Sequence, residues 1–222
     1  MIMNMKLTAT LAALVAAGAM STFGQGYVLF VTAKSGVYDN FSGASVVAPG
    51  DVTGTFLWNA STTAADPLGA GVATTATTLS GSWGTVSNMM ASGWNVASNG
   101  GTEADVADNA SGSFKGQQAY NGGVSFGLQN SAAGSSIEVV VIGWDNLTGA
   151  GTLGAAAQAG DALGWSGAFV YATGGSAGAT VSTFGQSGFA PFGVVGATPE
   201  PTSLAIAGLG GLSMLFLRRR KS

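Results

Sequence analysis

Glycine is the residue type that most constrains what this chain can fold into. The sequence has 37 Gly among 222 residues, roughly 17% against about 7% in an average protein. Glycine costs about 1 kcal/mol at a helical position, and the Thr residues that accompany it are β-branched and stiff. Long helices are therefore disfavoured, and short strands joined by turns are expected. The hydrophobic share of 46% favours a folded core over disorder.

The composition also removes much of the usual catalytic chemistry. The sequence contains no His and no Cys, so the commonest general base, the usual zinc ligands, thiol nucleophiles and disulfides are absent. It also lacks a Walker-type phosphate loop. The absence of Cys fits both a cytosolic protein and an exported protein without disulfides, so it does not indicate a cellular compartment. We therefore expect a protein that is not an enzyme and that needs no cofactor and no metal.

Charge is unevenly distributed along the chain. Four of the seven basic residues stand together as Arg218, Arg219, Arg220 and Lys221. Residues 25–198 hold two bases against nine acids, which gives this part of the chain a formal charge of −7. A surface of that sign repels phosphate backbones and anionic lipid. We therefore expect no nucleic-acid partner.

The beginning of the chain has the three parts of a secretory signal peptide. Lys6 precedes the uncharged, largely apolar stretch 7–20, and small residues follow. We favour cleavage after Gly24, although Ala17-Gly18-Ala19 fits the A-x-A pattern better inside the apolar run. The alternative interpretation is a buried, alanine-rich helix. Export explains the single Lys followed by an apolar run more directly, so residues 1–24 are interpreted as a signal peptide.

The end of the chain has the sequence features of a membrane anchor: a proline-containing tripeptide, an apolar stretch and a basic cluster, in that order. The tripeptide Pro199-Glu200-Pro201 keeps the backbone extended, and the uncharged stretch 204–217 follows it. As a helix, its 14 residues rise about 21 Å, less than the roughly 30 Å hydrocarbon core. The four terminal cations can snorkel, and the positive-inside rule holds them in the cytoplasm. The sequence thus predicts a short transmembrane helix; the alternative is a helix packed on the body.

This order of tripeptide, apolar helix and basic cluster resembles the PEP-CTERM sorting signal of Gram-negative bacteria that encode an exosortase. The resemblance concerns residues 198–222. It indicates where the protein is sorted and says nothing about the activity of the body. It implies that exosortase recognises Pro199, Glu200 and Pro201 and cleaves near them. It also implies that Arg218, Arg219, Arg220 and Lys221 act as the membrane stop before processing. The released body would reach the cell surface or the exopolysaccharide matrix.

The remaining residues, 25–197, are expected to form one mainly β body, an antiparallel β-sandwich or jelly-roll-like fold. The clearest strand is 137–144, whose nearly continuous β-branched run is typical of a strand covered on both faces. A short helix is possible at 154–162. Asn99-Gly100 and Asn121-Gly122 indicate tight turns, and the other Gly residues are interpreted as turns. The further candidate strands are 27–33, 44–48, 52–58, 124–129, 167–172 and 192–195.

Three acids lie close together in the sequence at Glu103, Asp105 and Asp108. Clustered oxygen ligands can hold Ca²⁺, but the spacing lacks the EF-hand pattern. We therefore favour a solvated acidic loop, with calcium binding as the alternative.

Two further candidate sites concern polysaccharides. Glu138 and Asp145 flank the strand 137–144 and suggest a glycosidase pair on paper, although an outward-facing strand position explains Glu138 better. Exposed tryptophans would stack on sugar rings, which makes a carbohydrate-binding module the alternative to a structural role. Core packing is the default expectation for Trp58, Trp83, Trp94, Trp144 and Trp165.

Overall fold

A computed structural model describes residues 24–34, 36–38, 52–68, 82–109, 116–145 and 148–194. The signal peptide up to residue 23, the candidate strand 44–48, the tripeptide at 199–201 and the stretch 204–217 lie outside the described residues. Within the described part of the chain, no helix is both long and apolar enough to cross a membrane.

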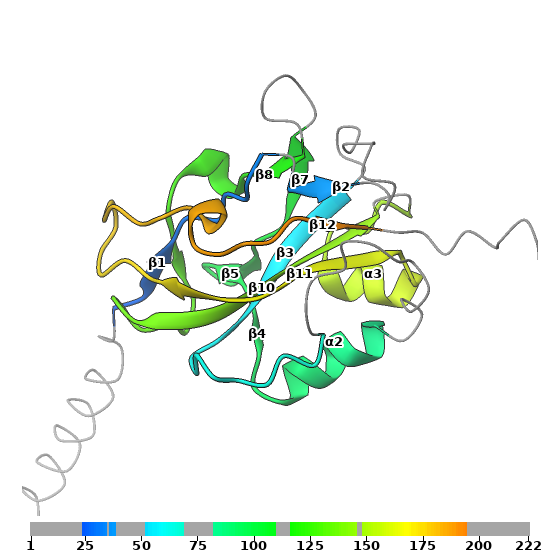
Figure 1. Cartoon of the computed structure of the whole chain (residues 1–222), viewed down its shortest axis with the longest axis horizontal. Helices are drawn as coiled ribbons and strands as arrows, with labels where there is room; N and C mark the ends of the chain where they lie inside the picture. Colours follow the sequence, from blue (N-terminus) through cyan, green and yellow to red (C-terminus); the bar gives the residue numbers. More distant parts are fainter. Residues whose placement is uncertain are drawn as a thin grey trace, which may run out of the picture.

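The centre of the fold is a six-stranded antiparallel sheet (Figure 1). Its strands follow the order β11-β10-β3-β7-β8, and β4 also pairs with β3. The longest pairings join β10 to both β3 and β11. The bounds are β3 Val52–Asn59, β4 Asn95–Val96, β7 Val106–Asn109, β8 Gln117–Gln118, β10 Ser136–Asp145 and β11 Leu163–Ala172.

Strand β10 is buried on both faces, as its sequence predicts. Its odd-numbered residues Ile137, Val139 and Val141 belong to one hydrophobic cluster. Its even-numbered residues Val140, Ile142 and Trp144 belong to a second cluster on the opposite face. This division follows from the alternation of side chains along a strand. Two separate layers therefore cover the sheet.

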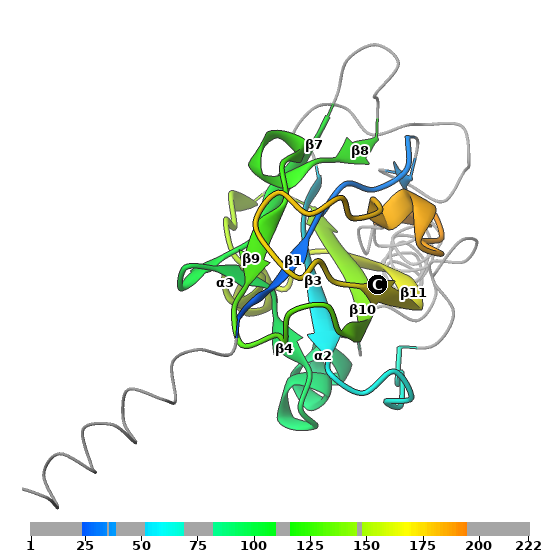
Figure 2. The same ribbon diagram turned by 90° about the vertical axis from the view of Figure 1, so that its left-hand side faces the viewer.

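Helices cover one face, and short strands cover the other (Figures 1 and 2). Helices α2 Ser82–Ala91 and α3 Leu153–Ala159 pack against the cluster around Trp144. The opposite cluster is completed by the pairs β1–β9 and β2–β12 and by the 3₁₀ helix η5. The bounds are β1 Gly26–Val28, β9 Phe126–Leu128, β2 Val37–Tyr38, β12 Phe192–Gly193 and η5 Phe184–Gln186. The mainly β, antiparallel character is confirmed, whereas a β-sandwich is not.

The segment after β11 returns across the strand-covered face and is held there by aromatic packing. The ring of Phe184 lies 4.9 Å from those of both Phe56 and Tyr171, measured between centroids. The Tyr171 hydroxyl donates to the Ser182 carbonyl at 2.8 Å and accepts from the Leu29 amide at 3.0 Å. One phenol thus joins β11 to segments from both ends of the described chain.

A row of three glycines crosses the sheet in register, with Gly143 of β10 paired to Gly54 of β3 and to Gly164 of β11. A Cβ on Gly143 would lie 3.0 Å from the Phe192 ring, and one on Gly164 would overlap the Gly193 carbonyl oxygen. Gly143 and Gly164 therefore let β12 cross directly over the backbone, while Gly54 leaves room for the Gln118 side chain. Gly54 and Gly143 lie within predicted strands, whereas Gly164, in β11, corrects the expectation that glycines outside those strands mark turns.

Most expected elements have a counterpart in the structure. Strands 52–58 and 137–144 match β3 and β10, and the possible helix at 154–162 appears as α3. The run 27–33 is strand only at its start, in β1, and β11 begins four residues before the expected 167. Helix α2 was not expected.

Both predicted turns are confirmed. Asn99-Gly100 lies in the hairpin between β5 Ser98–Asn99 and β6 Thr102–Glu103. Asn121 and Gly122 have φ of 53° and 65° within the 3₁₀ helix η3 Tyr120–Gly123.

Candidate functional site beside helix α2

Helix α2 has a cavity on each of two sides. Residues three or four apart share a helix face, so Trp83, Val86, Ser87 and Met90 line one cavity. Asn88, Met89 and Ser92 line the other. We call these the apolar cavity and the polar cavity, after the side chains that line them.

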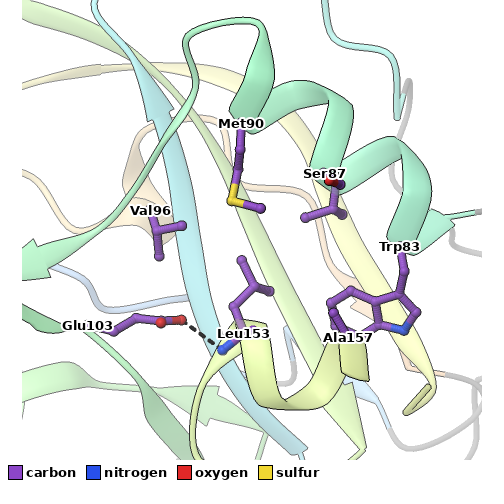
Figure 3. Close-up of a pocket in the computed structure, with 9 residues that line it drawn as sticks. Trp83, Ser87, Met90, Val96, Glu103, Leu153 and Ala157 are labelled. Carbon is purple, nitrogen blue, oxygen red and sulfur yellow. Dashed lines mark hydrogen bonds between the residues drawn. The ribbon is translucent and has the colours of Figure 1, made fainter. Parts of the chain in front are cut away.

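The apolar cavity has a volume of about 300 Å³ and lies between α2 and α3 (Figure 3). From α3 it is lined by Leu153, Gly154 and Ala157. The Trp83 indole is held in place because its Nε1 donates to the Asp161 carbonyl at 2.7 Å. Figure 3 shows Trp83 and Glu103 on opposite sides of the cavity. The space is therefore a hydrocarbon-lined cavity with a carboxyl group at one side.

Glu103 is positioned by the first turn of α3. Its Oε1 accepts a hydrogen bond from the Leu153 amide at 2.8 Å. The neighbouring N-cap, Thr152, accepts from the Ala155 amide at 3.2 Å. Both groups satisfy amides that have no partner within the helix. The Glu103 carboxyl group is thus fixed where strand β6 meets helix α3.

Asp105 forms a coupled pair with Glu103. Burial, followed by the hydrogen bond and the charge of Glu103, raises the pKa of Asp105 from 3.8 to about 8. Asp105 Oδ1 is itself buried without a hydrogen-bond partner. Asp105 therefore keeps its proton at neutral pH.

The three clustered acids do not form the solvated loop expected from the sequence. Asp108 is 5% exposed, and its Oδ1 accepts from the Val52 amide at 3.2 Å. Glu103 and Asp105 are partly buried. Glu103 and Asp108 thus accept hydrogen bonds from the backbone amides of Leu153 and Val52. Across the described segments, no three His, Cys, Asp or Glu side chains are grouped to hold a metal ion.

The polar cavity is larger, at about 590 Å³. Its polar lining comes from Asn59, Ser61, Asn88 and Ser92. Asn59 Oδ1 accepts from the Ser61 amide at 2.8 Å, and Ser92 Oγ donates to the Asn88 carbonyl at 2.8 Å. These bonds fix the backbone around the cavity. Its lining includes no charged side chain, and the other lining residues are apolar: Ala64, Ala65, Pro67, Met89 and Trp94.

Core packing is the main role of the tryptophans, as expected. Trp58, Trp94, Trp144 and Trp165 are between 0% and 6% exposed. Trp83 is half-buried and lines the apolar cavity. Trp94, although buried, lines the polar cavity beside α2.

The structure does not bring Glu138 and Asp145 together. They lie seven positions apart on β10, whose register with β3 is continuous from Asn59 to Val52. At about 3.3 Å per residue their Cα atoms are roughly 23 Å apart, on opposite faces of the sheet. A glycosidase pair needs a spacing of about 5–9.5 Å. The pKa of the partly buried Glu138 is raised, mainly by burial and also by the charge of Asp66. A hydrogen bond with the Ala64 backbone partly offsets this rise.

The comparison with protein families concerns the end of the chain. Residues 197–221 match the family described as the PEP-CTERM protein-sorting motif. The chain carries a PEP-CTERM sorting signal. This match confirms the resemblance seen at Pro199-Glu200-Pro201, and it implies an exported protein whose tail is recognised by exosortase. No curated protein and no solved structure matches the chain.

The match does not extend to the signal peptide at 1–24 or to the body at 25–197, so the division into 1–24, 25–197 and 198–222 stays a prediction. It spans the stretch 204–217, but the transmembrane helix stays a prediction because this stretch lies outside the described residues. The membrane stop at Arg218, Arg219, Arg220 and Lys221 lies outside the described residues.

Proposed function

We propose that this chain is an exported protein of the cell surface or exopolysaccharide matrix, with a structural or binding role and no catalysis. The observation that carries the proposal is the PEP-CTERM match at residues 197–221. Before processing, the apolar stretch 204–217 and the basic cluster after it hold the tail in the membrane. Exosortase then cleaves near the PEP-CTERM tripeptide and releases the β-rich body to the outside.

The tripeptide is tested by Glu200→Ala in a host with exosortase and in one without it. Because the two prolines keep Glu200 extended for recognition, the variant should accumulate as full-length, membrane-bound chain. Intact mass and cell fractionation measure this. Thr202→Ala, just outside the tripeptide, is the matched control and should be processed normally. Equal processing of Glu200→Ala and the unchanged chain in the exosortase host would contradict the proposal.

The alternative function, carbohydrate binding, is favoured by the polar cavity. Its amide and hydroxyl groups suit a ligand with many hydroxyls, because each buried hydroxyl needs a hydrogen-bond partner. We propose Asn88 as a ligand contact on this reading. Asn88→Ala should weaken binding of the host exopolysaccharide about tenfold, or roughly 1.4 kcal/mol, in calorimetry. Ser87→Ala, which faces the apolar cavity, is the control. The alternative is refuted if the unchanged protein does not bind the polysaccharide.

A further inference from the structure

The lining of the apolar cavity specifies the chemistry of its ligand. The lining side chains are apolar except for Ser87 and Glu103, since the Trp83 Nε1 already donates to the Asp161 carbonyl. A sugar would leave most of its hydroxyls without partners there, at a cost of about 1–3 kcal/mol each. The cavity therefore suits a ligand with an apolar body and one polar group.

The polar end of that ligand must donate hydrogen bonds. Glu103 offers a carboxyl group, and the amide of Leu153 and the carboxyl of Asp105 already donate toward it. No Lys or Arg is among the residues that line the cavity. The surrounding body has a formal charge of −7 over residues 25–198, which attracts cations and repels anions.

We propose that the apolar cavity binds a small organic cation, an alkyl- or arylammonium, whose ammonium group contacts the Glu103 carboxylate. Its hydrocarbon part packs against Trp83 and Leu153. A volume of about 300 Å³ is at the lower end of ligand cavities, so the ligand is small. This inference goes beyond sorting by exosortase, and its test does not depend on processing of the tail.

The probe is phenethylammonium, with 2-phenylethanol as its neutral counterpart. Calorimetry with the protein recovered from the exporting host should show at least tenfold tighter binding of the ammonium. Glu103→Gln keeps a side-chain carbonyl to accept from the Leu153 amide but removes the charge. This variant should bind the two probes equally.

A second pair of variants tests the location. Gly154 lines the cavity, and a Cβ there meets open space, so Gly154→Leu should fill the cavity and abolish binding of both probes. Gly84 of α2 also has open space around its Cβ and does not line the cavity. Gly84→Leu is therefore the matched control and should bind normally. Ala157→Leu, also on α3, repeats the test if circular dichroism shows Gly154→Leu unfolded.

Two results would overturn the proposal. One is equal affinity of the unchanged protein for both probes, which would identify a hydrocarbon site without charge recognition. The other is ammonium binding that persists in folded Gly154→Leu or Ala157→Leu, which would place the probe elsewhere on the acidic body.

Discussion

At the scale of single residues, Asp105 couples folding to pH. Its pKa is raised from 3.8 to about 8 by burial and by Glu103. Between those values the folded chain keeps a proton that the unfolded chain releases. Its free energy of unfolding therefore falls as the pH rises through this window. The contribution of Asp105 is most favourable below about pH 4.

Asp105→Asn should remove this pH dependence. The amide has a similar shape and does not ionise, so the stability of the variant should fall less between pH 4 and pH 8 than that of the unchanged protein. Urea unfolding at pH 4, 6 and 8 measures the difference. Glu138, whose pKa is also raised, contributes in the same direction to both proteins and cancels in the comparison. Equal slopes in the two proteins would show that Asp105 is not the group responsible.

At the scale of elements, Gly143 and Gly164 of the glycine row determine how closely β12 approaches the sheet. The Phe192 ring packs on Gly143, and the Gly193 backbone lies over Gly164. A side chain at either position would push β12 outward, whereas one at Gly54 would meet the Gln118 side chain of β8. Glycine within a strand normally weakens it, and here close packing of another segment compensates for that loss.

Two Gly→Ala substitutions should have opposite effects. Gly164→Ala should lower the free energy of unfolding by about 1–3 kcal/mol, because the new methyl overlaps the Gly193 carbonyl and forces the backbone apart. Gly84→Ala, in α2 with open space around it, should raise that free energy by up to about 1 kcal/mol through helix propensity. Chemical denaturation measures both. Effects of the same sign would contradict this account of the glycine row.

Which elements the sequence could predict depends on their length and local pattern. Strand β10 was predictable because five of the eight residues 137–144 are β-branched. Helix α2 was not, because Gly84 and Thr85 are poor helix formers and interrupt its apolar pattern of Trp83, Val86, Met89 and Met90. The cavities beside α2 were missed for the same reason. The acids at Glu103 and Asp105 were visible in the sequence, but the hydrogen bond that fixes Glu103 comes from Leu153 in α3, fifty residues away.

At the scale of the whole molecule, the sorting signal and the fold differ in how the sequence encodes them. The sorting signal is a linear pattern of proline, apolar residues and terminal cations, so the sequence alone was enough to recognise it. The layers of the body depend on distant pairings, such as β1 with β9 and β2 with β12. Strands of two or three residues carry no periodicity of their own. For this reason the antiparallel β class was predictable and the arrangement of its layers was not.

The burial of Val194 limits how far the exosortase target can extend from the body. Val194 is 2% exposed and directly follows β12. Pro199 lies five positions further along the chain, and an extended chain spans at most about 3.6 Å per residue. The tripeptide thus lies within roughly 18 Å of a core residue. On the function proposed above, exosortase therefore works close to the folded body, and every core residue of the described part of the chain precedes the tripeptide.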